Sequence, residues 1–163
     1  MNGESPRVNA CSFTGHRELG TIDYMKLRQL LDRAIAYAYQ NGCRVFYNGG
    51  ARGFDAEAAD RVILFRHSHP DVRLIMLLPC PGQADRWSPS QRFRYENILR
   101  RADEVVYVAD HYSPYCMHQR NEQLVHRADM LVAYLSHDRS GAAQTVAMAK
   151  RKGIAVYNLY GKE

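Results

Sequence analysis

Side chains able to bind a ligand gather in four short segments, each of which follows an apolar run typical of a buried strand. The first segment is Thr14-Gly15-His16-Arg17, which places a hydroxyl, an imidazole and a guanidinium beside a glycine. The planar guanidinium of arginine suits phosphate, and glycine allows a ligand to approach the backbone closely. These residue types predict a ligand-binding turn, and a tight turn with solvated side chains is the alternative.

The second segment, residues 48–55, reads NGGARGFD between a predicted strand and a predicted helix. Its three glycines are Gly49, Gly50 and Gly53. Backbone amides at the start of a helix favour phosphate, so we expect these glycines and Arg52 to bind an anion. The pattern matches neither GxxxxGK[ST] nor GxGxxG, which argues against a P-loop hydrolase. Asp55 is either a ligand-binding residue or the cap of the following helix.

The third segment, residues 111–121, contains two tyrosines able to stack on a base, and it places Arg120 and Asn121 early in a predicted helix. We expect both residues to bind ligand. Three residues of this segment resemble metal ligands by type, namely His111, Cys116 and His118. Their spacing matches no common zinc pattern, so no metal is expected.

The fourth segment, residues 136–145, follows the fifth predicted strand and opens a helix. Gly141 allows close approach to that helix N-terminus, while Ser140 and Thr145 supply hydroxyls. By itself this pattern is only a weak indication of a ligand-binding site. If this segment and the glycine-rich segment face one cleft, two helix N-termini would hold a diphosphate or a phosphoribosyl group.

The elements that must position these segments alternate regularly between strand and helix. Continuous apolar runs predict strands at residues 8–13, 45–47, 72–78, 105–108, 130–134 and 154–159. Helical periodicity predicts helices at residues 24–40, 55–66, 90–102, 117–128 and 142–152. Such alternation predicts a three-layer, Rossmann-like α/β fold, in which a mainly parallel sheet has helices on both faces. Ligands of such sheets bind beyond the carboxyl ends of the strands, where all four segments lie.

Composition narrows the class of protein further. The chain has 163 residues, of which 46% are hydrophobic and 24% charged, so we expect one folded domain over residues 1–163 with a core at about 8–159. The four cysteines are widely spaced, and no signal or membrane segment is evident, which predicts reduced thiols, a cytoplasmic protein and no membrane partner. A net charge of +5, mostly from arginine, mildly favours phosphorylated ligands or nucleic acid.

Taken in order, the motifs TGHR, NGGARGFD, MHQRN and ADMLVAYLSHDRSGAAQT resemble the YpsA/YoqJ family of the SLOG superfamily, which is named for the Smf/DprA and LOG proteins. The resemblance covers nearly the whole chain and implies a Rossmann-like fold. It also implies a site for nucleotides or nucleotide-derived diphosphates such as ADP-ribose or NAD. By motif, this site would include residues of all four segments, and a homodimer is possible by analogy with LOG proteins.

LOG enzymes hydrolyse nucleoside 5′-monophosphates and carry an arginine-lysine pair and a PGGxGTxxE motif. This chain has Arg120-Asn121 in place of the pair, and Thr145 aligns with the threonine, but residues 146–148 lack the glutamate. Binding is therefore better supported than turnover, and Asp55 and Glu57 are the only candidates for a catalytic carboxylate.

The leading hypothesis is a sensor or accessory protein that binds a nucleotide or a nucleotide-derived diphosphate and requires no cofactor. The second is an N-glycosidic hydrolase related to LOG. The third is single-stranded nucleic-acid binding, as in DprA relatives, because phosphate contacts and eleven tyrosines for stacking suffice for it. A purely structural or partner-binding role comes last.

Overall fold

The computed structural model describes residues 9–137 and 139–162. The strands are β1 (Ala10–Gly15), β2 (Val45–Asn48), β3 (Arg73–Leu78), β4 (Glu104–Tyr107), β5 (Met130–Tyr134) and β6 (Ala155–Asn158). The helices are α1 (Tyr24–Gln40), α2 (Phe54–Arg66), α3 (Pro89–Arg101), α4 (Cys116–His126) and α5 (Gly141–Lys152). Strand and helix thus alternate along the whole described chain.

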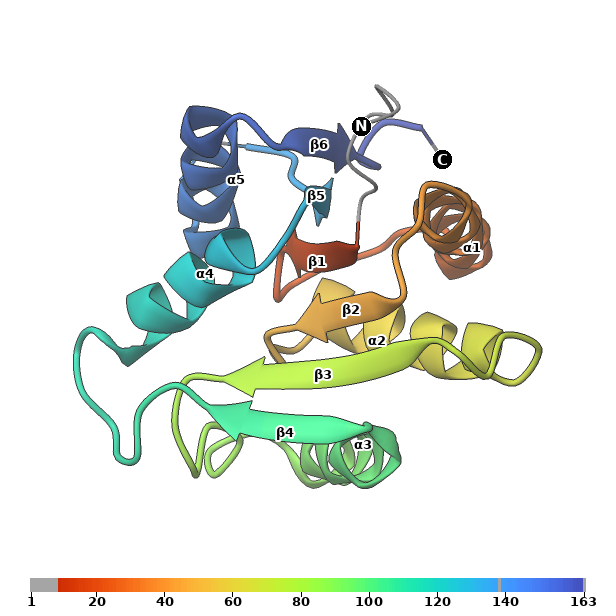
Figure 1. The fold of residues 1–163 in the computed structure, drawn as a ribbon. Helices are drawn as coiled ribbons and strands as arrows, with labels where there is room; N and C mark the ends of the chain where they lie inside the picture. Colours follow the sequence, from red (N-terminus) through yellow and green to blue (C-terminus); the bar gives the residue numbers. More distant parts are fainter. Residues whose placement is uncertain (1–8, 138, 163) are drawn as a thin grey trace.

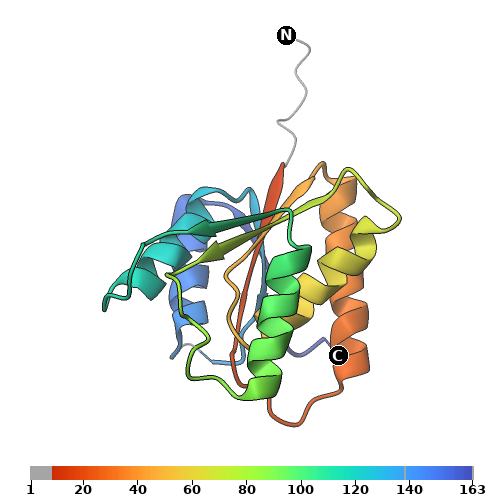
Figure 2. The ribbon, with the colours of Figure 1, turned by 90° about the horizontal axis from the view of Figure 1, so that it is seen from below.

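All six strands form one parallel sheet in the order β4-β3-β2-β1-β5-β6. Helices α1, α2 and α3 cover one face, and α4 and α5 pack together on the other (Figures 1 and 2). The predicted three-layer Rossmann-like fold is confirmed. The chain adds strands outward from β1 to β4, then crosses to the other side of β1, so the topological switch lies between β1 and β5.

Alternating side chains of the buried strands supply two separate cores. In β3, Leu74, Met76 and Leu78 join the large core beneath α1 to α3, while Ile75 and Leu77 pack toward Leu124 of α4. The same alternation divides β5 between the two faces. Strands covered on both faces need apolar residues at every position, which explains why they read as continuous apolar runs in the sequence.

Two boundaries differ from the predicted ones in a way that matters for the site. Strand β1 extends to Gly15, because Thr14 and Gly15 pair with Ala133 and Tyr134 of β5. These two residues therefore end a strand instead of forming a turn; the predicted start at residue 8 lies outside the described residues. Helix α2 begins at Phe54 with Gly53 as its N-cap, so the interpretation of Asp55 as a capping residue is wrong.

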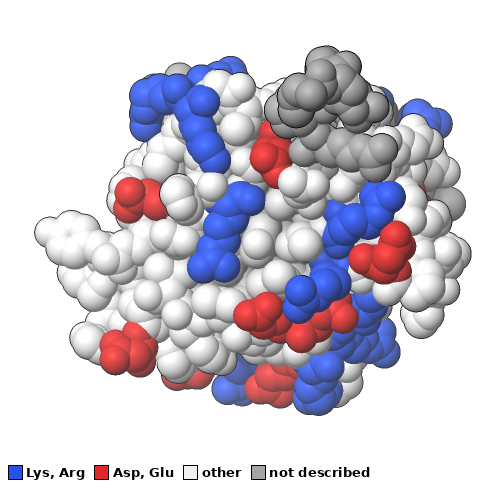
Figure 3. Space-filling view, in the orientation of Figure 1, with Lys and Arg blue, Asp and Glu red and all other residues white. Residues whose placement is uncertain are grey.

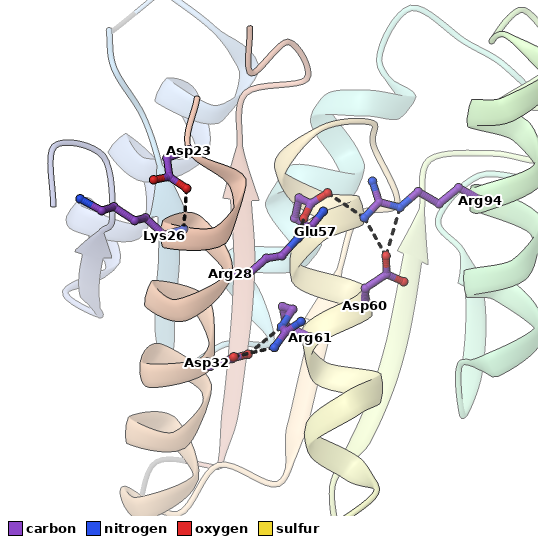
Figure 4. Close-up of polar contacts among 8 residues, drawn as sticks. All are labelled: Asp23, Lys26, Arg28, Asp32, Glu57, Asp60, Arg61 and Arg94. Atoms are coloured by element: carbon purple, nitrogen blue, oxygen red, sulfur yellow. Dashed lines mark hydrogen bonds and ion pairs between the residues drawn. The ribbon is translucent and has the colours of Figure 1, made fainter. Parts of the chain in front are cut away.

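Ion pairs join the three helices on the first face (Figure 4). Glu57 of α2 is buried and accepts from Arg28 of α1 and Arg94 of α3, both at 2.8 Å. Arg61 forms a bidentate ion pair with Asp32, in which Nε donates to Oδ1 at 2.7 Å and Nη2 donates to Oδ2 at 2.6 Å. The short α2 is therefore held from both sides, which fixes the position of its N-terminus.

Candidate functional site

A cavity of about 550 Å³ lies at the carboxyl ends of β1 and β5, where the order of the strands reverses. We call it the switch-point cavity. Nine predicted ligand-binding residues line it: Thr14, Gly15, His16, Arg17, Asp55, Arg120, Asn121, Ser140 and Gly141. Segments from four parts of the chain thus meet at one place, which is where open α/β sheets bind their ligands. Its size is in the usual range for small-molecule sites.

Arg120 of α4 is the most unusual side chain in this cavity, because it is 5% exposed and forms no ion pair with the described residues. Its Nε donates to Asn121 Oδ1 at 2.7 Å, and its Nη1 donates to the carbonyl oxygen of Gly49. Within the described part of the chain, the only hydrogen-bond contact of its Nη2 is with the Met117 sulfur, at 3.8 Å. Burial lowers the pKa of Arg120. A buried cation without a direct counter-ion is costly, so this guanidinium favours an incoming anion.

Asp55, at the start of α2, enters the same cavity from the other face of the sheet. Its Oδ2 accepts from the Ala51 amide at 3.1 Å, whereas Oδ1 is buried and has no hydrogen-bond partner among the described residues. Burial raises the pKa of Asp55 to about 6, although the positive charge of Arg120 opposes this shift. The free oxygen is available to accept a hydrogen bond from a ligand or, when protonated, to donate one.

His16 joins the ends of β1 and β5. Its Nε2 accepts from the backbone amide of Ser136 at 2.8 Å, and its ring stacks on His137 with a centroid distance of 4.5 Å. A backbone amide can only donate, so Nε2 carries no proton and a neutral ring holds its proton on Nδ1. Burial and the neighbouring His137 both lower the pKa of His16, which keeps the ring neutral.

The glycine-rich loop serves packing within the protein. The amides of Gly50 and Ala51 already donate to the side chains of Asn48 and Asp55, at 2.8 and 3.1 Å. At Gly49 a Cβ atom would lie 2.7 Å from Arg120 Nη1. Gly53 has a φ of 71°, and a Cβ there would collide with the carbonyl oxygen of Arg17. These glycines thus let the loop pack against Arg120 and the end of β1.

The N-terminus of α5 forms the opposite wall of the switch-point cavity. The Ser140 hydroxyl caps the helix by accepting from the Ala143 amide at 3.1 Å, and Gly141 and Ala142 border the cavity. Thr145 lies outside the cavity: it is fully buried and its hydroxyl donates to the Gly141 carbonyl at 2.9 Å. Its hydroxyl is therefore engaged within the helix.

Four of the predicted ligand-binding residues line a second, smaller cavity of about 200 Å³ on the other side of the glycine-rich loop: Gly50, Arg52, Gly53 and Asp55. Glu57 also lines this second cavity. Burial alone would raise the pKa of Glu57, but hydrogen bonds from Arg28 and Arg94 outweigh it and lower the pKa. Both candidate catalytic carboxylates therefore line the second cavity, but only Asp55 also reaches the switch-point cavity.

Sequence reasoning missed several lining residues of the switch-point cavity. Met117 and Leu124 lie on the same face of α4 as Arg120 and Asn121, so helical spacing from Arg120 would have found them. His137 lies within the fourth segment but was not singled out. In the described ranges no three histidine, cysteine or acidic side chains come together as metal ligands, and no helix there is long and apolar enough to cross a membrane.

Six parallel strands with a cavity at the switch between β1 and β5 define a Rossmann-like α/β protein. Within that class, the chain belongs to the YpsA family of SLOG proteins: the family model, described as the YspA SLOG family, matches residues 14–159. The match spans all four sequence segments, so the predicted family is confirmed.

Two relatives illustrate the sequence similarity. The uncharacterized SPbeta prophage-derived protein YoqJ of Bacillus subtilis is 29% identical over 118 residues, which cover 65% of this chain and 69% of YoqJ. A UPF0398 protein of Halalkalibacterium halodurans is 27% identical over 144 residues, covering 83% of this chain and 76% of the relative. The similarity therefore extends over most of each protein.

Solved structures with the same fold include two DNA processing proteins. DprA of Streptococcus pneumoniae gives a TM-score of 0.61 at 13% identity, with 91% of this chain and 49% of that chain covered. DprA of Helicobacter pylori, described for its single-stranded DNA binding mode, gives 0.63 at 18% identity, with 92% and 64% covered. This chain thus spans between half and two thirds of the DprA chains, and the similarity shows the fold alone.

Proposed function

We propose that the switch-point cavity binds a nucleotide or a nucleotide-derived diphosphate, and that the protein acts as a sensor or accessory protein for that ligand. The observation that carries this proposal is the buried guanidinium of Arg120, which lines the cavity without an ion pair in the described part of the chain. An arginine held in place by Asn121 and Gly49 is oriented before the ligand arrives, so little entropy is lost when it meets phosphate.

Three further features suit the parts of such a ligand. Arg17 and the N-terminus of α5 border the same cavity, and both favour the negative charge of a second phosphate. The free Oδ1 of Asp55 can accept from a ribose hydroxyl. The stacked rings of His16 and His137 offer a flat surface for a base.

Ligand-observed NMR tests the proposal with ADP-ribose, NAD, AMP and cyclic nucleotides. We expect saturation transfer from the wild-type protein to at least one of them, and we expect Arg120→Met to weaken binding of that ligand about tenfold or more, because a charge-assisted hydrogen bond to phosphate would be lost. Arg127→Met is the matched control, since Arg127 is the C-cap of α4, does not line the cavity and contacts Gln123 instead. No transfer to any nucleotide, or equal loss in both variants, would overturn the proposal.

Hydrolysis of an N-glycosidic bond is the second candidate, and the raised pKa of Asp55 favours it. In that reaction a protonated Asp55 donates a proton to the departing base as the carbon–nitrogen bond breaks, water adds to the sugar carbon, and the proton that the water loses returns to the Asp55 carboxylate. Following the same NMR samples for hours tests it: new signals from free base that are absent with Asp55→Asn would establish turnover. If the ligand stays intact throughout, hydrolysis is rejected and binding is the only one of the two functions that is supported.

Single-stranded DNA is the third candidate. Tyr112 and Tyr115, at 72% and 71% exposure, flank Pro114 at the rim of the cavity and could stack on bases. On the face shown in Figure 3, however, basic side chains are interspersed with acidic ones and form no continuous stripe. Steeply salt-dependent binding of a labelled oligonucleotide, together with no response to nucleotides, would favour DNA over the nucleotide proposal.

A further inference from the structure

The second cavity, of about 200 Å³, has walls of a different kind from those of the switch-point cavity. We call it the aromatic cavity, because Trp87, Tyr95 and Tyr24 line it together with apolar side chains of β3 and α3. Trp87 and Tyr95 meet edge to face, with centroids 5.1 Å apart and ring planes at 74°. Such walls favour a flat ring over a flexible chain.

Most of the charge at this wall is already neutralised. Both carboxylate oxygens of Glu57 accept from arginines, and Arg94 also contacts Asp60 at 2.7 Å (Figure 4). Arg52 is paired with Glu18 at 3.2 Å through Nη2. An ionic ligand would have to break these pairs, so the cavity favours an uncharged one.

Two buried polar atoms on lining residues nevertheless have no hydrogen-bond partner among the described residues. One is a donor, Nε of Arg52, and the other an acceptor, Oδ1 of Asp55. Buried polar groups are normally satisfied, and leaving one unsatisfied costs free energy. A ligand with one acceptor and one donor would satisfy both atoms. Because Oδ1 of Asp55 is the same atom that is offered to a ribose hydroxyl in the switch-point cavity, only one of the two ligands can use it at a time.

We propose that the aromatic cavity is a second binding site, which takes a small, uncharged, planar ring bearing a hydrogen-bond acceptor and a donor. Free nucleobases and nicotinamide share this chemistry. The inference goes beyond the proposed function, because it concerns a separate cavity and does not require a phosphate. The two cavities share Ala51 and Asp55, so a ring bound in one changes the surroundings of the carboxylate in the other.

Trp87 provides a direct readout, because it is the only tryptophan of the chain and lines the aromatic cavity, not the switch-point cavity. Titration with adenine and with nicotinamide should change its fluorescence saturably for at least one of them. Cyclohexanecarboxamide, which has an amide but no planar ring, should give no saturable change. Free N-acetyltryptophanamide corrects for absorption by the added compounds. A response that rises linearly with both planar compounds would overturn the inference.

Two variants test the location. Ala56→Phe should fill the aromatic cavity and abolish the saturable response, while Ala147→Phe, a half-buried α5 position that lines neither cavity, should keep it. Arg52→Met, which removes the free donor without filling space, should weaken ring binding about tenfold. If Ala56→Phe does not fold, the ring affinity of Arg52→Met alone tests the location of the site. An unchanged ring affinity in a folded variant of either kind contradicts the proposed site.

Arg120→Met separates this inference from the proposed function. It should weaken nucleotide binding while the saturable Trp87 response to the free ring persists, because Arg120 does not line the aromatic cavity and acts on it only through the charge of Asp55. If nucleotides bind but neither ring compound does, only the second site is refuted. If a ring binds but no nucleotide does, only the proposed function is refuted.

Discussion

The guanidinium of Arg120 and the carboxylate of Asp55 line one cavity from opposite faces of the sheet, yet they form no ion pair. Both are buried, at 5% exposure each, and each contacts the glycine-rich loop instead: Arg120 at the Gly49 carbonyl and Asp55 at the Ala51 amide. The loop therefore contacts both of these oppositely charged, buried side chains while they form no ion pair with each other. Because the two charges are not paired with each other, a ligand can contact both, with an anionic group at Arg120 and a hydrogen-bond donor at Asp55.

The first prediction concerns the pH dependence that Asp55 adds to stability. Folding raises its pKa from the ordinary value to about 6, so the native state binds more protons than the unfolded state between these values. Its contribution is fully favourable below pH 4 and is lost as the pH rises through 6, a change of roughly 3 kcal/mol. As the pH rises from 4 to 8, the unfolding free energy of the wild type should therefore fall by this amount relative to that of Asp55→Asn.

Urea unfolding at several pH values measures this difference. The comparison with Asp55→Asn cancels the titration of all other groups, and asparagine can still accept from the Ala51 amide. A difference that stays constant from pH 4 to 8 would show that Asp55 titrates at its ordinary value.

The second prediction concerns His16, whose pKa is lowered by burial and by His137. The native state therefore binds fewer protons than the unfolded state. The stability from the contact with the Ser136 amide is present above the ordinary histidine pKa, near 6.5, and is lost as the pH falls through the native value. NMR titration of the His16 ring should give a lower midpoint in the folded protein than in urea, and equal midpoints would contradict the contact.

The overall fold was predictable because buried parallel strands and amphipathic helices leave strong, regular patterns. The place of the cavity was predictable too, since Thr14 lies at the end of β1 and Arg17, Arg120 and Gly141 come after strands whose carboxyl ends lie at the same edge of the sheet. In a parallel sheet the carboxyl ends of the strands lie at one edge, whatever the conformations of the loops that follow them. Of the fourteen predicted ligand-binding residues, nine lie at the switch-point cavity.

The direction in which each loop residue faces was not predictable. Glycines in the second segment suggested an amide cradle for phosphate, but Gly50 and Ala51 donate to nearby side chains of the protein. Asp55 and Glu57 are two residues apart on one helix, so they point to different sides. Only long-range partners, such as Arg28 and Arg94 for Glu57, decide which carboxylate is engaged.

The third prediction separates the two carboxylates. Glu57→Gln removes the negative charge and one of the two acceptor oxygens that Arg28 and Arg94 contact, and these arginine side chains, 44% and 39% exposed, can be rehydrated. We therefore expect a modest loss of about 1–3 kcal/mol in unfolding free energy, measured in urea. Nucleotide binding at the switch-point cavity should remain, whereas Asp55→Asn should alter it. Loss of nucleotide binding in a folded Glu57→Gln protein would assign Glu57 to the site.

The fourth prediction concerns Gly53, which has a φ of 71° and packs against the end of β1. In Gly53→Ala the new methyl group must displace the carbonyl oxygens of His16 and Arg17, in addition to adopting an unfavourable backbone conformation. Gly20→Ala is the matched control, because Gly20 has a similar φ of 64° but no atom within 4 Å of the added Cβ. The collision alone should therefore make Gly53→Ala the more costly substitution, by about 1–3 kcal/mol of unfolding free energy.

The same substitution should weaken nucleotide binding, because Arg17 and His16 both line the switch-point cavity and must move with the displaced backbone. Urea unfolding and ligand-observed NMR on the two glycine variants test both effects. Equal destabilisation by the two substitutions would show that the loop yields without disturbing β1. If Gly53→Ala were the less stable variant but bound nucleotide normally, the end of β1 would not form part of the site.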